Sequence, residues 1–256
     1  MKVLFHSFIV ACSMYSKIPM PKTDWKEEYM RYTMCFFPLI GVFIGLMIYG
    51  GYWVMDGQST GLLLKTIFMI VLPLLITGGI HFDGFLDTVD AKSSYKSKEE
   101  KLEILKDPHT GAFAIIGASI YFLLSLGIYS EITIKEMGVL CVGYTMSRAL
   151  SGLGVATFPM AKNTGLLSIF SKGSDKKVVT VVMMIYIISC SMIMCLFDPV
   201  YGFASIIVSF LVFFYYYHMS IKIFGGITGD LAGYFLQVCE LSIAAALVLV
   251  KYLYPF

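Results

Sequence analysis

The chain has 256 residues, of which 58% are hydrophobic and 14% are charged, and its mean hydropathy is +0.79. Soluble globular domains carry roughly 25% charged residues, so this composition excludes an ordinary soluble protein and predicts an integral membrane protein. The net charge of +2, without interleaved aromatic and basic residues, argues against a nucleic-acid partner. We expect residues 1–256 to form a single integral membrane domain, because spans of ~20 residues leave no room for a soluble one.

The first residues resemble a secretory signal peptide, but their composition argues for a retained helix. His6 interrupts the apolar run, and Lys17 and Pro19 follow it without a clear cleavage site of small residues. We therefore expect an interfacial N-terminal helix that lies along the membrane surface.

Apolar runs of spanning length then follow one another along the chain. They predict an all-α, polytopic membrane helix bundle with about seven transmembrane helices. The sequence is compatible with a homo-oligomer but does not require one. The seven candidates are Tyr32 to Met55, Gly61 to Ile80, Ala112 to Tyr129, Met137 to Met160, Val178 to Phe197, Val200 to His218 and Leu231 to Val250.

The basic residues are distributed unevenly between the two sides that seven spans define. Fifteen of the 19 lysines and arginines fall on the side of the N-terminus and only three on the other, while Arg148 lies within a span. Because cytoplasmic loops carry the excess of basic residues, we expect the N-terminus and the loops around 81–111 and 162–177 in the cytoplasm. The C-terminus is then outside, and the protein is multi-pass in the cell inner (cytoplasmic) membrane.

Three aspartates follow the second apolar run. Asp83, Asp87 and Asp90 stand at i, i+4 and i+7, so on a helix they fall within roughly 60° of one another. Three ionised carboxylates on one face repel strongly unless a cation lies between them, and oxygen ligands without cysteine favour Mg²⁺ or Mn²⁺. We therefore predict a Mg²⁺ site at these three residues, facing the cytoplasm. The alternative is an acidic first turn of a solvated helix.

The loop that follows contains a second group of candidate site residues. It is rich in lysine and serine and ends in the turn Asp107-Pro108-His109-Thr110-Gly111. Lys106 and His109 are candidate phosphate-binding residues, and Asp107 is a candidate to assist the metal or to activate a nucleophile. The structural alternative is a surface ion pair between Lys106 and Asp107.

Arg148 lies midway along an apolar run, where a charge costs ~2.5 to 3.5 kcal/mol on insertion scales. It needs a partner, which is either a carboxylate such as Glu240 or a substrate phosphate. Asp230 begins the last span after several glycines and is a further candidate for substrate binding, since glycines allow a close backbone approach.

Several of these stretches together resemble the cobalamin synthase family, the adenosylcobinamide-GDP ribazoletransferases, in order and over nearly the whole chain. Two departures are present: Ser16-Lys17 stands where the family usually has Thr-Arg, and His109 stands where it usually has an arginine. The second removes a bidentate phosphate contact. The stretches that carry the resemblance are SKIPMP (16–21), FFPLIGVFIGL (36–46), GGIHFDGFLDTVDA (78–91), LKDPHTGAF (105–113), SRAL (147–150) and GGITGDLAG (225–233) with Glu240.

The resemblance implies a Mg²⁺-dependent phosphotransferase of the last steps of cobalamin biosynthesis. Its partners are a nucleotide-activated corrinoid and a ribazole: adenosylcobinamide phosphate passes from its GDP ester to α-ribazole, or to its 5′-phosphate, and GMP leaves. Cleavage of a diphosphate needs cations at the phosphates, and an aspartate face beside a lysine-rich loop agrees with that need.

Two other classes of protein remain open at the level of the sequence. A CDP-alcohol phosphotransferase also uses an aspartate-rich helix, but its DGxxAR box is absent because Asp83-Gly84 is followed by Phe-Leu-Asp. A secondary transporter with carboxylates and Arg148 along its pathway is the alternative without catalysis.

Overall fold

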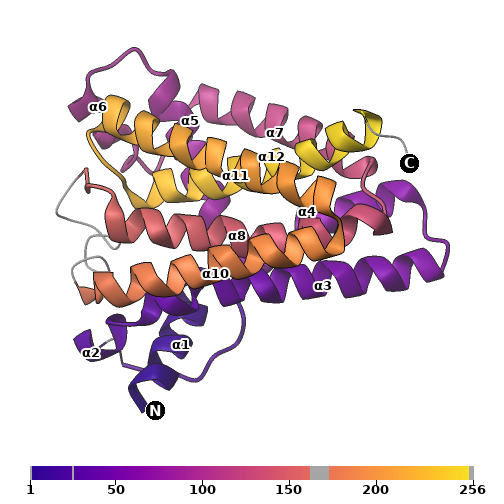
Figure 1. The fold of residues 1–256 in the computed structure, drawn as a ribbon. Coiled ribbons are helices and arrows are strands. Elements are labelled where there is room, and N and C mark those ends of the chain that lie inside the picture. The colour runs from indigo at the N-terminus through magenta and orange to yellow at the C-terminus, as the bar shows by residue number, and fades with distance from the viewer. Residues whose placement is uncertain (1, 25, 162–172, 254–256) are drawn as a thin grey trace.

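A computed structural model describes residues 2–24, 26–161 and 173–253, and in this part the chain is an all-α bundle (Figure 1). The predicted fold class is therefore confirmed. The elements are α1 (Lys2–Tyr15), α2 (Glu27–Met30), the 3₁₀ turn η1 (Thr33–Phe36), α3 (Phe37–Gly57), α4 (Leu62–Thr77), α5 (Ile80–Ser93), α6 (Lys98–Ile104), α7 (Ala112–Ser130), α8 (Ile134–Thr157), α10 (Lys176–Phe197), α11 (Pro199–Met219), the π-helical turn η2 (Ser220–Phe224) and α12 (Gly229–Leu253).

Six helical segments of the described chain are long and apolar enough to cross a membrane, and they confirm six of the seven predicted spans. Helix α8 is the central one, because 83% of its apolar window is buried among the other helices. The six segments are Thr33–Gly57, Ala112–Ser130, Ile134–Thr157, Lys176–Phe197, Pro199–Phe224 and Gly229–Leu253.

The second predicted span differs from the rest because it is broken. Helix α4 has 16 residues, and α5 leaves it at an angle of 97°, so the two together count as a seventh span only if a bent pair is counted as one. Gly78 and Gly79 form the break, with left-handed φ values of 65° and 77°. The N–H of Gly79 donates to the carbonyl of Leu74 over 2.9 Å, which is the hydrogen bond that ends a helix in a Schellman motif.

The elements with the most charge lie at one end of the bundle. Figure 1 shows α2, α6 and the beginning of α10 at this end and the end of α12 at the opposite one. Arg31 and Asp175 join two of these segments by an ion pair of 2.9 Å. The sides predicted from the basic residues agree with this arrangement, although Lys162 and Lys172 of that prediction lie outside the described residues.

The predicted N-terminal helix is present as α1. Its 14 residues are about 21 Å long, which is too short to cross the ~30 Å apolar core of a bilayer. One side packs on the bundle, with Val10 and Ala11 fully buried, while Leu4 and Phe5 are exposed. Its position in the membrane interface stays a prediction.

Candidate active site

Helix α5 carries the three aspartates, so the helix on which the prediction depended is confirmed. Asp83 is exposed, and Asp87 and Asp90 are half-buried. The helix begins directly after the bend, so it turns away from the direction of α4 and lies along α12. The bend therefore decides where in the molecule the carboxylates lie.

Two glycines bring α5 and α12 into close contact. A Cβ at Gly84 would lie 2.8 Å from the backbone of Asp230, and one at Gly233 would lie 2.7 Å from the carbonyl oxygen of His81. This approach places Asp230 beside the aspartate face, and Asp83, Asp90 and Asp230 each repel the charge of Asp87. The structure thus adds Asp230 to the three aspartates.

The beginning of α7 closes the other side of this face. Gly111, which precedes α7, lies against the Asp90 carboxylate so closely that a Cβ there would be less than 3.0 Å from both carboxylate oxygens. The candidate residues Lys106, Asp107 and His109 belong to the loop that ends at this point. The end of that loop therefore lies at the Asp90 carboxylate, while a site that Lys106, Asp107 and His109 share with the aspartates stays a prediction.

Within the loop, Lys106 and Asp107 each have a local partner. The Lys106 ammonium lies 3.1 Å from the Glu103 carboxylate, one helical turn before it. Asp107 accepts a hydrogen bond from the His109 N–H over 2.9 Å and lies 2.7 Å from the His109 ring Nδ1. These hydrogen bonds lower the pKa of Asp107. The His109 side chain remains 89% exposed and is accessible to a ligand.

Arg148 has the carboxylate partner that was one of its two predicted partners. Its Nη1 lies 2.8 Å from the Glu240 Oε1 and donates to the Tyr144 carbonyl over 2.8 Å, and Ser147 donates to the same carboxylate oxygen over 2.9 Å. The two charged side chains are 2% and 6% exposed. The pair joins α8 to α12 in the interior.

Two cavities meet at Asp83. One, of about 600 Å³, lies under the bend between α4 and α5 and is also lined by Ser16 and Lys17. The other, of about 200 Å³, is more enclosed and is also lined by His81 and Asp230. His81 does not join the aspartates: its ring is buried against Tyr15 and Phe37, as expected for a residue on another side of the helix.

Sequence reasoning did not assign Ser16 and Lys17 to the site. The available signal was their place at the start of SKIPMP, one of the stretches that carry the family resemblance. They are far from the aspartates along the chain, and only the packing of α1 beside the bend brings them close.

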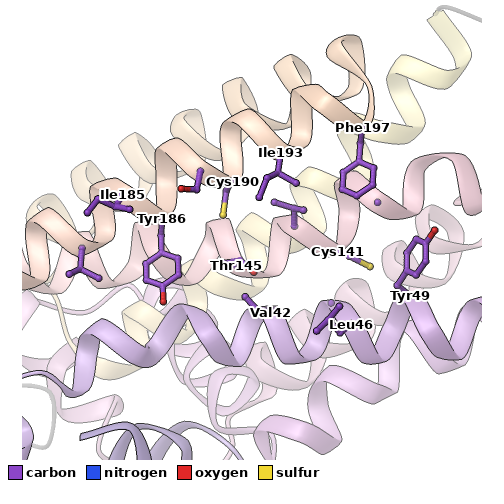
Figure 2. Close-up of a pocket in the computed structure, with 15 residues that line it drawn as sticks. Val42, Leu46, Tyr49, Cys141, Thr145, Ile185, Tyr186, Cys190, Ile193 and Phe197 are labelled. Carbon is purple, nitrogen blue, oxygen red and sulfur yellow. The ribbon is translucent and has the colours of Figure 1, made fainter. Parts of the chain in front are cut away.

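A third cavity, of about 810 Å³, lies between α3, α8 and α10 and has a different character (Figure 2). Figure 2 shows Val42 and Leu46 of α3 across from Ile193 and Phe197 of α10. No charged residue of the described chain lines this cavity, so it offers nothing that would hold a phosphate or a metal. The polar cavities at Asp83 are the better candidates for chemistry.

The aspartate face fits a Mg²⁺ ion by the chemistry of its donors. The nearest lysine on α5, Lys92, contacts the hydroxyl groups of Tyr215 and Tyr234 instead of neutralising the carboxylates. In the described part of the chain no three His, Cys, Asp or Glu side chains gather closely enough to hold a metal by themselves. Mg²⁺ is usually bound by one or two carboxylates together with substrate phosphates and water, so an open acidic face suits it.

Comparison with known proteins identifies the family. The family model for cobalamin-5-phosphate synthase matches residues 7–248. A protein of Lachnoclostridium phytofermentans named adenosylcobinamide-GDP ribazoletransferase is 44% identical over 246 residues, which cover 96% of this chain and 94% of that protein.

Proteins of the same name from more distant bacteria are also similar. One from Clostridium botulinum (strain Alaska E43) is 33% identical over 94% of this chain and 96% of its own length. One from Fusobacterium nucleatum is 31% identical over 91% and 94%. No solved structure matches the chain. Since both the family model and these relatives cover nearly all of it, the chain belongs to the cobalamin-5-phosphate synthase family.

Proposed function

We propose that this membrane protein is a Mg²⁺-dependent adenosylcobinamide-GDP ribazoletransferase, the activity for which its relatives are named. The observation that carries the proposal is the open aspartate face of α5, formed by Asp83, Asp87 and Asp90 and joined by Asp230. The reaction transfers adenosylcobinamide phosphate from its GDP ester to a hydroxyl group of α-ribazole, or of its 5′-phosphate, with release of GMP.

In this reaction the ribazole hydroxyl oxygen attacks the phosphorus on the corrinoid side of the diphosphate. A new P–O bond forms to the ribazole, the bond to the bridging oxygen breaks, GMP leaves with that oxygen, and the hydroxyl proton is lost to solvent. When bound, Mg²⁺ offsets the charge that develops on the phosphate oxygens. The acidic face supplies its ligands, with Asp83 and Asp87 nearest to the bend and Asp90 held against Gly111.

The loop before α7 supplies groups for the substrate phosphates. Lys106 and His109 are exposed on this loop, whose last residue, Gly111, lies against Asp90, and we assign them to the substrate phosphates. Asp107 is a hydrogen-bond acceptor that shapes the turn, and its lowered pKa keeps it ionised at neutral pH. It can accept a hydrogen bond from the attacking hydroxyl and orient it, but it is too weak a base to retain the proton.

The proposed orientation of the protein in the membrane is based on the distribution of its basic residues and on the solubility of the nucleotide substrate. The aspartate face lies at the end of the bundle where most basic residues gather, and we assign this end to the cytoplasm of the cell inner membrane. Water-soluble nucleotides are present on that side, so a cytoplasmic active site gives them direct access.

The test is an assay of the purified protein in lipid nanodiscs with the GDP ester of cobinamide, α-ribazole and Mg²⁺. GMP and the ribazole-linked corrinoid should appear in equal amounts, and GMP should not appear when ribazole is omitted. Turnover of a CDP-alcohol substrate in place of the GDP ester would favour a CDP-alcohol phosphotransferase. Movement of the corrinoid into sealed vesicles without GMP would favour a transporter.

A further inference from the structure

The cavity of about 600 Å³ under the bend has a charge pattern of its own. Among the described residues that line it, Lys17 is the only basic one and Asp83 the only acidic one. Its other walls come from the end of α1 and from α4 and α5 on both sides of the bend, among them Ser16, Gly78 and Gly79.

Lys17 is held at this cavity by its backbone and by its side-chain stem. Its N–H donates to the carbonyl of Ile76 over 2.7 Å, which ties the segment after α1 to the last turn of α4. Its stem crosses Gly78, where a Cβ would lie less than 3.0 Å from the Cε of Lys17. The bare glycine therefore makes the left-handed bend and also leaves room for the lysine.

The Lys17 ammonium has no ion-pair partner among the described residues. No carboxylate of the described residues forms an ion pair with it, whereas Lys65, Lys106 and Lys251 are each paired. The first turn of α5 makes the cavity more positive, because its N-cap is Gly79 and no side chain caps the free N–H groups of this turn. A cation therefore lines one wall of a cavity whose other wall holds the first carboxylate of the proposed metal site.

We propose that Lys17 binds the diphosphate of the nucleotide-activated substrate in this cavity. The inference rests on the proposed function and adds a phosphate-binding residue to it. An anionic diphosphate placed here would have the Lys17 ammonium on one side and, on the other, Asp83, a residue that would hold the cation, so positive charge would be available on both sides of it. The acceptor ribazole, which carries no diphosphate, makes no comparable demand on Lys17.

Three substitutions at exposed lysines test the role of the charge. Lys17→Met keeps the stem and removes the charge, so we expect the KM for the GDP ester to rise about tenfold or more, as for a lost charge-assisted hydrogen bond. The KM for ribazole should stay unchanged. Lys17→Arg should restore most of the loss, and the matched control Lys22→Met, on the same exposed segment, should behave as the wild type.

Two glycine substitutions test the same site through its geometry. Gly78 and Gly79 have similar left-handed φ values, so alanine strains the backbone about equally at both. Only at Gly78 does the new Cβ meet Lys17, since nothing lies within 4 Å of one at Gly79. Gly78→Ala should therefore raise the KM for the GDP ester more than Gly79→Ala does.

A binding measurement with GDP and Mg²⁺ separates this inference from the proposed function. Calorimetry should show GDP binding to the wild type and at least tenfold weaker binding to a folded Lys17→Met variant. Unchanged GDP affinity and KM in Lys17→Met, with normal GMP release, would overturn the inference and leave the transferase standing. If the wild type releases no GMP but loses GDP binding on Lys17→Met, the transferase is wrong while the phosphate site remains.

Discussion

At the scale of single residues, Gly111 controls the position of Asp90. A side chain at this residue would occupy the space of the Asp90 carboxylate. Gly111→Ala should therefore move that carboxylate and lower the rate of GMP release about a hundredfold, since misplacement by ~1 Å costs this much at a catalytic site. Gly127→Ala, within α7, is the control, because nothing lies within 4 Å of a Cβ at that position. Equal rates for both variants would show that Asp90 has no role in turnover.

The buried pair of Arg148 and Glu240 leads to a prediction about stability. Removing one partner leaves an uncompensated charge in the interior, so Arg148→Gln should destabilise the protein by about 3–5 kcal/mol. Adding Glu240→Gln should recover part of this loss, because two neutral side chains replace an unpaired charge. Thermal unfolding in detergent measures both variants. A double variant no more stable than Arg148→Gln would mean that the pair does not hold α8 and α12 together.

The sequence predicted the arrangement of a residue correctly where helical spacing or the cost of burying a charge determines it. Asp83, Asp87 and Asp90 share a face because of their spacing, and Arg148 needed a partner, either a carboxylate or a substrate phosphate, because it lies within an apolar run. Lys17 was missed because its place beside Asp83 depends on the packing of α1 against a bend far along the chain. The sequence left the partner of Lys106 open between Asp107 and a substrate phosphate and did not consider Glu103, which lies one helical turn before it.

At the scale of helices, the contact between α5 and α12 depends on residues without side chains. A Cβ at Gly84 would meet the backbone of Asp230 at 2.8 Å, and a backbone cannot rotate away as a side chain can. Gly84→Ala should therefore force the helices apart and destabilise the protein by about 1–3 kcal/mol, as overpacking does. Gly50→Ala in α3 meets nothing within 4 Å and should be neutral or stabilising in the same unfolding assay. Equal stabilities would argue against the tight crossing.

The bend between α4 and α5 is the part of the fold that the sequence did not predict. The segment stays apolar through Gly78-Gly79 into Ile80 and Phe82, so its average hydropathy predicts one continuous span. Glycines permit a left-handed turn without requiring it. The bent conformation is stabilised by tertiary contacts that a hydropathy profile does not report. Among them are the hydrogen bond from Lys17 to Ile76 and the packing of Gly84 against Asp230. The other six spans were predicted because hydrophobic length alone determines them.

At the scale of the whole molecule, the arrangement of charge predicts the orientation in the membrane. With single cysteines in a cysteine-free background, Ser94→Cys and Ser174→Cys should be labelled only from the cytoplasmic side. Ser59→Cys, in the exposed connection between α3 and α4, should be labelled from outside. Labelling of Ser94→Cys from outside would reverse the orientation and place the aspartates away from the nucleotides of the cytoplasm.

The most direct test of the account is the Mg²⁺ dependence of GMP release in a variant of the aspartate face. Asp87→Asn keeps the size of the side chain and removes a ligand charge, so GMP release should be lost or should require much higher Mg²⁺. Asp56→Asn is the matched control: Asp56, at the end of α3, pairs with Lys65, at the beginning of α4, over 2.7 Å and outside the site, so its activation curve should match that of the wild type. A folded Asp87→Asn variant with the wild-type Mg²⁺ activation curve would contradict the central claim that this face holds the catalytic cation.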